Sequence, residues 1–286
     1  GALALALANG NIARVQEDGA LLVIASGSPS WPRALTAGAD GTLFVGLEDG
    51  TVVGRRAGLT PDRTGDGTLL ADVPVQGQLS ESIGPQAWTY AGHTGDVLTV
   101  NAVDLTRSNA VDMALTISAP DGRELAANDD QLGLDLYGIY DAQIPALTLP
   151  TDGDYRITVS PVGGAGVYTL GAAPDRRLTL EATGTTRITG ALQDVFPAQR
   201  WVFEGRAGQT LTITMLAQSG SLDPVLELFT IDGRRLAYND DAAEDLTLGA
   251  NAQLFRIQLP RDEQYILKAG RYEGVGLYEL VIVPNS

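Results

Sequence analysis

The chain has 286 residues, of which 44% are hydrophobic and 19% charged, a balance typical of packed globular domains rather than of disordered segments. Its formal net charge of −16 repels phosphate backbones and argues against nucleic acid as a partner. The absence of cysteine excludes disulfides, zinc–thiolate sites and cysteine nucleophiles. No run of about 18–20 apolar residues occurs, so we expect no membrane span.

The first 64 residues predict a short β-rich segment. Leu alternates with small residues over 1–8, which suits a strand, and further strands are expected over 11–15, 20–25, 42–46 and 51–55. Turn sequences such as Glu48-Asp49-Gly50 separate these strands. The chain starts at Gly1 without an initiator Met, so we expect a processed product or a fragment.

The stretch from Pro32 to Gly46 resembles a β-propeller blade of the NHL or sugar-lactonase type. Blades need about 40–45 residues each and at least about four to close a ring, so this segment cannot close one. Either further blades lie upstream, or these strands pack onto the next domain or a neighbouring subunit.

An internal repeat organises the rest of the chain. Residues 88–100 recur as 201–213, residues 121–130 as 232–241, and residues 141–168 as 251–278. Three blocks in the same order indicate a duplication. The sequence therefore predicts three parts: an N-terminal β-strand segment over 1–64, a first domain over 65–174 and a second over 175–286.

Within each repeat the hydrophobic period is two, as a half-buried strand requires. Leu211, Ile213 and Met215 alternate with threonines, and their first-repeat counterparts keep the same phase. Turns such as Asp121-Gly122 and Asp232-Gly233 separate such runs. The expected fold is all-β: two tandem jelly-roll-like β-sandwiches that follow a short N-terminal β-rich segment.

Each repeat resembles a bacterial pre-peptidase C-terminal (PPC) domain, a jelly-roll-like β-sandwich appended to secreted peptidases and other exported proteins. The resemblance covers about residues 65–286. The residues that carry it are an aromatic pair (Trp88 and Tyr90; Trp201 and Phe203), an Asn-Asp-Asp triplet, a Leu-Pro pair and a final Gly-x-Tyr-x-Leu. The repeats depart from each other at Met113, which stands where the second has Pro224, and at Gly153, which the second replaces by Glu263. The family resemblance implies a secreted or cell-surface location.

The two triplets, residues 128–130 and 239–241, are the strongest candidates for a functional site. Oxygen ligands crowded on a loop suit Ca²⁺, and some domains that resemble this family hold calcium near such loops. The alternative is that Asn and Asp cap turns with their own side chains. Calcium is thus a candidate cofactor, and the candidate ligands are Asp112, Asp129, Asp130, Asp141, Asp223, Asp240 and Asp241.

Other motifs carry less. The Asp62–Gly67 stretch begins like an EF-hand loop, but Val73 stands where a bidentate Glu belongs, so we interpret it as a polar linker. His93, the only histidine, lies in an expected turn, and its counterpart in the second repeat is Arg206. A module that loses this residue on duplication works without it, so we expect no enzyme activity.

The sequence therefore predicts a non-catalytic extracellular structural or adhesion module that self-assembles into a fibre or surface layer. The alternative is a pair of accessory C-terminal binding domains of a secreted enzyme such as a peptidase. The expected partners are further copies of the chain or an extracellular polymer. Tyr137, Tyr140, Tyr238 and Tyr272 lie near loops, where they either form a binding platform or pack in the core or at the rim of the sandwiches.

Overall fold

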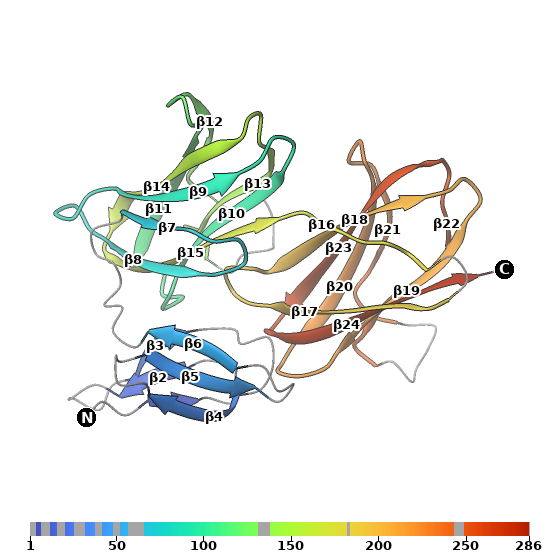
Figure 1. Ribbon diagram of the computed structural model, residues 1–286, viewed down its shortest axis with the longest axis horizontal. Coiled ribbons are helices and arrows are strands. Elements are labelled where there is room, and N and C mark those ends of the chain that lie inside the picture. Colours follow the sequence, from blue (N-terminus) through green and yellow to red (C-terminus); the bar gives the residue numbers. More distant parts are fainter. Residues whose placement is uncertain are drawn as a thin grey trace. The chain divides into compact units, whose positions relative to one another are not determined.

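The computed structural model describes residues 67–130, 138–181, 184–242 and 249–285 in full, and within 1–66 it describes the backbone of residue 66 and of six further strands. The N-terminal strands form two three-stranded antiparallel sheets, β1-β2-β3 and β4-β5-β6 (Figure 1). Their bounds are β1 Ala4–Ala6, β2 Ile12–Val15, β3 Leu21–Ala25, β4 Pro32–Ala37, β5 Thr42–Leu47 and β6 Val52–Arg56. The four strands expected over 11–55 lie where β2, β3, β5 and β6 are found, whereas β4 was not predicted. Proline can begin a strand because only its own backbone donor is lost.

The first repeat folds into two antiparallel sheets that pack face to face. One has the order β13-β10-β15-β8, and the other has the order β12-β11-β14-β9, to which β7 adds in parallel beside β9. The strands are β7 Asp66–Thr68, β8 Val75–Leu79, β9 Gln86–Gly92, β10 Val97–Asp104, β11 Val111–Ser118, β12 Glu124–Asn128, β13 Ala142–Thr148, β14 Gly153–Gly164 and β15 Gly166–Pro174.

The second repeat has the same arrangement. Its four-stranded sheet has the order β17-β24-β19-β22, and its five-stranded sheet has the order β16-β18-β23-β20-β21. The strands are β16 Arg176–Arg177, β17 Thr186–Leu192, β18 Ala198–Gly205, β19 Thr210–Ala217, β20 Asp223–Thr230, β21 Arg235–Asn239, β22 Ala252–Gln258, β23 Glu263–Glu273 and β24 Gly276–Asn285.

Strand order identifies both halves as jelly rolls. When β8 to β15 are numbered one to eight, one sheet has the order one-eight-three-six and the other the order two-seven-four-five. Numbering β17 to β24 in the same way gives the same two orders. Two sheets that interleave eight strands in this way make the double Greek key of a jelly roll. The predicted all-β fold with two tandem jelly-roll-like sandwiches is confirmed.

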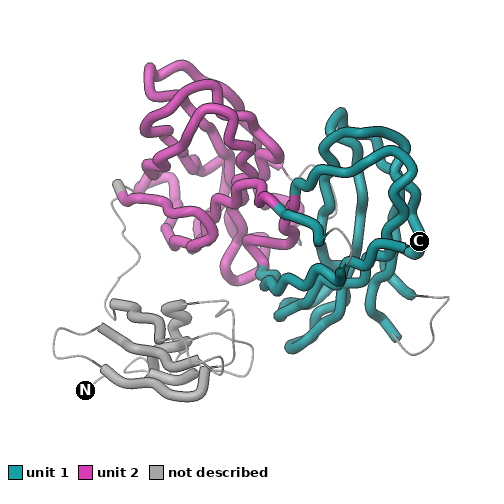
Figure 2. The backbone as a smooth tube through the Cα atoms, turned by 45° about the vertical axis from the view of Figure 1, so that its right-hand side comes forward, with its two compact units in different colours: residues 1–59, 178–193, 202–286 teal, residues 60–177, 194–201 magenta. Residues whose placement is uncertain are grey.

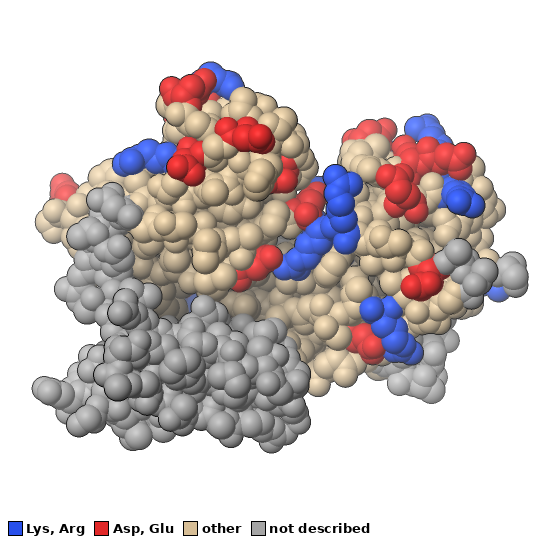
Figure 3. Space-filling model, viewed as in Figure 1, with Lys and Arg blue, Asp and Glu red and all other residues tan. Residues whose placement is uncertain are grey.

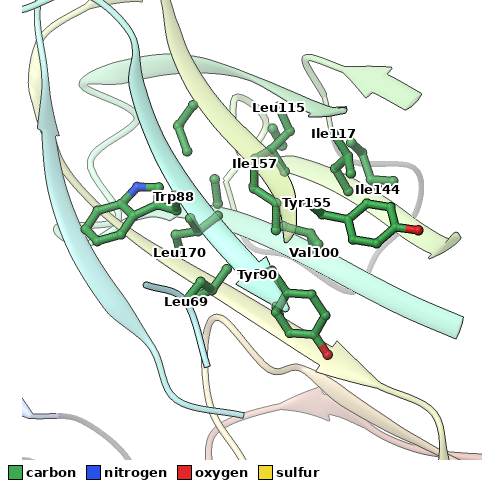
Figure 4. Close-up of a cluster of buried hydrophobic side chains, with 14 of the residues drawn as sticks. Leu69, Trp88, Tyr90, Val100, Leu115, Ile117, Ile144, Tyr155, Ile157 and Leu170 are labelled. Carbon is green, nitrogen blue, oxygen red and sulfur yellow. The ribbon is translucent and has the colours of Figure 1, made fainter. Parts of the chain in front are cut away.

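Alternation along the strands builds each core. In β11 every second side chain from Val111 to Ile117 is buried, and in β20 the same pattern runs from Pro224 to Thr230. The first core joins side chains from both of its sheets, including Trp88, Val100 and Tyr155 (Figure 4). Burial of these side chains is the main force that holds the two sheets together.

The repeated aromatic residues have structural roles in the first jelly roll. Trp88 Nε1 donates to the Tyr168 hydroxyl at 3.0 Å, and that hydroxyl donates to Gln86 Oε1 at 2.9 Å, so one buried chain of hydrogen bonds links the two sheets. Tyr155 donates to the carbonyl of Thr151 at 2.6 Å and thereby fixes the turn that follows the Leu-Pro pair. In the second jelly roll, Tyr265 makes the same bond to Arg261 at 2.9 Å.

The chain divides into two compact units (Figure 2). One comprises residues 60–177 and 194–201, and the other comprises residues 1–59, 178–193 and 202–286. Residues 194–201, which lie in sequence inside the second repeat, thus belong with the first jelly roll. The three-part division predicted from the sequence treats 1–64 as a separate segment and stays a prediction.

Residues 194–197, which we call the strap, explain why this part of the second repeat belongs to the unit of the first jelly roll. Val195 and Phe196 are buried against Val103 and Ala173 on the outer face of the first jelly roll's four-stranded sheet. Asn101 Nδ2 donates to the Val195 carbonyl at 2.8 Å. The strap therefore covers a sheet face that would otherwise meet solvent.

Candidate functional site

Antiparallel pairing collects acidic side chains at one edge of the second jelly roll's five-stranded sheet. Strand β20 begins at Asp223, which lies directly opposite Glu273 at the end of β23. Strand β21 ends at Asn239, and Asp240 and Asp241 follow it. Because β20 runs antiparallel to both neighbours, its start and their ends meet at the same edge.

Like charges crowd this acidic edge. Burial raises the pKa of the Asp223 carboxyl above its ordinary value, and the charges of Asp241, Glu273 and Asp240 raise it further. A carboxylate whose neighbours are all acidic gains from a proton or a cation. The charges that act on Asp223 in the described part of the chain are thus of the same sign as its own.

The first jelly roll has a reduced version of the same edge. Burial and the charges of Asp130 and Asp129 raise the pKa of Asp112, which begins the equivalent hairpin. Asp112 lies opposite Gly163, so the first repeat lacks a counterpart of Glu273. Sequence reasoning missed Glu273 because its place beside Asp223 follows from strand register, which no short motif encodes.

Three of the candidate ligands gather in each repeat, and Asp141 lies apart from them. Asp141 accepts backbone N–H bonds from Asp104 at 2.8 Å and from Gly138 at 2.9 Å. Its counterpart Asn251 accepts the equivalent bond from Ala217 N at 2.7 Å. A neutral amide serves equally well there, which indicates a structural role. Burial and the nearby charges of Asp104 and Asp194 oppose two backbone hydrogen bonds, and the net result is a raised pKa for Asp141.

The asparagines of the two triplets also act on the backbone. Asn128 Nδ2 donates to the carbonyl of Gln143 at 2.8 Å, and Asn239 Oδ1 accepts from Gln253 N at 3.4 Å. Each asparagine thus ties the end of one strand to the next strand of the chain. These contacts fit the turn-capping interpretation for the first residue of each triplet and leave the two aspartates that follow at the sheet edge.

The donor chemistry of the acidic edges fits a hard cation such as Ca²⁺, which prefers carboxylate oxygens. Within the fully described ranges, however, no group of three or more Asp, Glu, His or Cys side chains converges closely enough to hold a metal ion. Residues 131–137 and 243–248, which directly follow the triplets, lie outside the described residues, as do residues 62–65 of the EF-hand-like stretch. Calcium binding stays a prediction.

Neutralising Asp223 is expected to stabilise the calcium-free protein. A raised folded pKa means that, between the unfolded value near 3.9 and the folded one, the native state binds more protons than the unfolded chain. Stability therefore rises as the pH falls through the folded pKa. Asp223→Asn removes the repulsion at neutral pH, so we expect a melting temperature higher by about 1–3 °C at pH 7 in chelator.

Differential scanning calorimetry from pH 7 to pH 4 tests this expectation. The gain should shrink with falling pH, because the wild-type carboxyl becomes protonated. Asp121→Asn provides the control, since Asp121 accepts the Arg123 backbone N–H in an exposed turn. A gain that is independent of pH would contradict the repulsion.

The outward face of the same sheet carries an aromatic and charged row. Glu227 on β20 lies opposite Tyr238 on β21 and opposite Lys268 on β23, and it pairs with Lys268 at 3.2 Å. Arg235 pairs with Glu227 at 3.0 Å and lies 5.2 Å from the centroid of the Tyr238 ring. The Tyr238 hydroxyl donates to Asp240 at 3.2 Å, so the row joins the acidic edge.

The ring and the guanidinium of this outer-face row are exposed, whereas Glu227 and Lys268 are mostly covered, and the row belongs to the second repeat alone. The Tyr238 side chain is 46% exposed, and Tyr272 at the end of β23 is 69% exposed. At the positions of Glu227, Tyr238 and Lys268 the first repeat has Thr116, Ala127 and Thr158, which pair in the same register. The exposure favours the platform interpretation for these two tyrosines over rim packing.

His93 lies in the turn between β9 and β10, with its side chain 79% exposed. Its backbone N–H donates to Asp96 Oδ2 at 2.9 Å, and the equivalent bond in the second repeat runs from Arg206 N to Gln209 Oε1 at 3.1 Å. The turn is therefore built in the same way with and without a histidine.

On the face shown in Figure 3, acidic and basic side chains form small groups on a surface that is otherwise uncharged. The described part of the chain has no helix long and apolar enough to cross a bilayer.

No protein-family model matches the chain, and no curated protein matches it. Similar solved structures include the pre-peptidase C-terminal domain of a collagenase from Bacillus anthracis, which is 20% identical over 38% of this chain and 93% of that one, with a TM-score of 0.30. The lysozyme inhibitor PliG of Salmonella Typhimurium is 14% identical over 38% of this chain and 98% of that one, with a TM-score of 0.27. An M60 catalytic domain with two CBM51 domains from Clostridium perfringens is 8% identical over 96% of this chain and 41% of that one, with a TM-score of 0.24. The strand order defines the fold of this chain independently of these similarities.

Proposed function

We propose that this chain is a non-catalytic module of an exported protein and that it binds an extracellular polymer through the second jelly roll. The outer-face row of Tyr238, Glu227, Lys268 and Arg235 carries the proposal, because it combines an exposed ring with charged hydrogen-bonding groups on a rigid sheet. A saccharide or peptide chain can lie against the ring while its polar groups bond the charges. The ordered motifs that resemble pre-peptidase C-terminal domains support an extracellular setting.

The duplication supports a binding role over catalysis. The repeated residues Trp88, Tyr155 and Tyr168 hold the first sandwich together, and Tyr265 repeats one of these contacts in the second. The residues Glu227, Tyr238 and Lys268 of the outer-face row differ from their first-repeat counterparts. Both repeats share one fold, but only the second has the charged and aromatic side chains of this row on its outer face. Such an arrangement suits a module that binds a partner through its surface.

Two forms of this function remain as proposals. The module is either an accessory binding domain of a secreted enzyme such as a peptidase, or a structural and adhesion unit of a cell surface. Polymer binding by the outer-face row is common to both forms. The second form also needs contacts between copies of the chain.

Tyr238→Ala should weaken polymer binding at least tenfold, because it removes the exposed ring and frees Arg235 from its position over it. Pull-down with insoluble polysaccharides (peptidoglycan, chitin and cellulose) and with fibrous collagen identifies the polymer, and the bound fraction against concentration measures the affinity. Phe255→Ala is the matched control, since Phe255 is 54% exposed but lies on β22 of the other sheet. Equal loss in both variants, or no binding by the wild type to any of these polymers, would overturn the proposal.

We also propose that the acidic edge of the second jelly roll binds Ca²⁺ more tightly than that of the first, because Glu273 adds a fourth carboxylate to Asp223, Asp240 and Asp241. Isothermal titration with CaCl₂ after chelator treatment should give a stronger site that Glu273→Gln weakens and a weaker one that it leaves unchanged. Bound Ca²⁺ should also raise the melting temperature. Heat and melting temperature that do not respond to CaCl₂ would contradict calcium binding.

A further inference from the structure

The contact between the strap and the first jelly roll has a specific shape. Phe196 fits over Gly171 on β15, where an added Cβ would lie 2.4 Å from the ring. The ring and Val195 leave Val103 only 5% exposed. A loop between the first two strands of one jelly roll thus covers the outer four-stranded face of another.

The first jelly roll has the same loop, and its apolar residue is exposed. Between β8 and β9, Ile83 stands at the position that Phe196 occupies between β17 and β18. Ile83 is 40% exposed, whereas Phe196 is 3% exposed. The loop is ordered, since Ile83 N and Gly84 N donate to the Ser80 carbonyl at 3.2 and 3.0 Å. It holds an isoleucine toward solvent at the position of the strap's phenylalanine.

The second jelly roll has the same receiving face, and that face is more open. Val103 and Gly171 are buried in the first repeat, but their counterparts Leu216 and Val281 are half-buried. The four-stranded sheet of the second repeat therefore presents aliphatic side chains at the positions that the strap covers in the first.

The loop and the face also match in size and hydrogen bonding. In the internal contact the Phe196 ring packs over Gly171, which has no side chain. In the proposed contact the smaller Ile83 side chain would pack over the larger Val281, so a smaller group on the loop meets a larger group on the face. Thr214 stands where Asn101 donates to the strap carbonyl, and its hydroxyl accepts from Gln253 Nε2 at 3.0 Å, as Asn101 Oδ1 does from Gln143. The threonine hydroxyl can donate its own proton to the carbonyl of an incoming loop.

We propose that the loop over residues 80–85 of one copy of this chain docks onto the outer face of β19 and β24 in a second copy. Loop and face are different surfaces, so the contact is heterologous and repeats head to tail. It goes beyond polymer binding and does not depend on it. A single loop buries little area, so the association is weak, and added salt strengthens it because the net charge of −16 is screened.

Sedimentation velocity over a concentration series in 0.15 and 0.5 M NaCl tests the docking of loop on face. The wild type should form dimers and longer chains with rising concentration. Ile83→Asp blocks the loop and Val281→Asp blocks the face, so each variant alone should stay monomeric. Val281 lies opposite Arg187, which favours retention of the fold in Val281→Asp, and Leu216→Asp blocks the same face if that variant does not fold.

The mixture of the two blocked variants gives the decisive result. One retains an intact face and the other an intact loop, so the mixture should stop at a one-to-one dimer. Ile231→Asp is the control, because Ile231 is 50% exposed in a turn outside the proposed contact and should assemble like the wild type. A monomeric wild type, variants that still assemble, or a mixture without dimer would overturn the proposal. Polymer pull-down by the monomeric variants reports the proposed binding function separately.

Discussion

Gly77→Ala is expected to lower the free energy of unfolding of the first jelly roll by about 2–4 kcal/mol, through overpacking and a broken hydrogen bond. Gly77 on β8 lies directly opposite Tyr168. An added Cβ would lie 2.3 Å from Gln86 Oε1 and 2.4 Å from the Tyr168 hydroxyl. Both groups are buried members of the hydrogen-bond chain that links the two sheets, so neither can move without losing a partner.

Calorimetry should show this loss as a lower melting transition for the unit that contains residues 60–177, with the other unit's transition unchanged. Gly163→Ala is the matched control, since an added Cβ there meets only Asp112 Cβ at 3.8 Å. Its effect should stay within about 0.5 kcal/mol. Equal losses in both variants would show that the close approach to Tyr168 does not matter.

Phe196→Ala is expected to cost about 3 kcal/mol, the lower end for truncating a buried phenylalanine. The side chain is 3% exposed and packs on Val103 and over Gly171. Although Phe196 lies in the second repeat of the sequence, the transition that shifts should be that of the first jelly roll, because the strap belongs to that unit.

Urea unfolding and calorimetry measure this effect, and Phe255→Ala serves as the exposed control at 54% exposure. The variant should also expose the apolar sheet face, so its binding of a hydrophobic dye should rise before the main transition. A shift confined to the second unit's transition would contradict the assignment of the strap.

Much of the fold could be predicted from the sequence because the signals are local. Period-two alternation located β11 and β20, and the Asp-Gly pairs located turns whose Gly122 and Gly233 adopt φ values of 85° and 84°. Glycine adopts such angles without strain, so its presence after Asp allows these turns to be predicted from the sequence. Because the same strand and turn patterns occur in both repeats, the sequence indicates two domains of the same fold.

The strap and the acidic edge depend on contacts distant in sequence, so they could be predicted only in part. The sequence around Val195 and Phe196 does not indicate that they pack on the preceding repeat, because a loop that docks on another domain has the same kind of sequence as an ordinary turn. The grouping of Asp223 with Glu273 follows from strand register, which no short motif encodes. The sequence marks Asp141 as a candidate ligand because it is acidic and stands in a repeated block, whereas in the structure it accepts backbone N–H bonds, as its counterpart Asn251 does.

The strap also affects how the first jelly roll folds while the chain is being synthesised. During synthesis the first jelly roll has all its own strands once residue 174 has emerged, yet the outer face around Val103 stays uncovered until Phe196 follows. Domains generally fold from the N-terminus as they leave the ribosome. The beginning of the second repeat therefore acts as the final piece of the first, and a ribosome that stalls between the two leaves a sandwich with one apolar face exposed to aggregation.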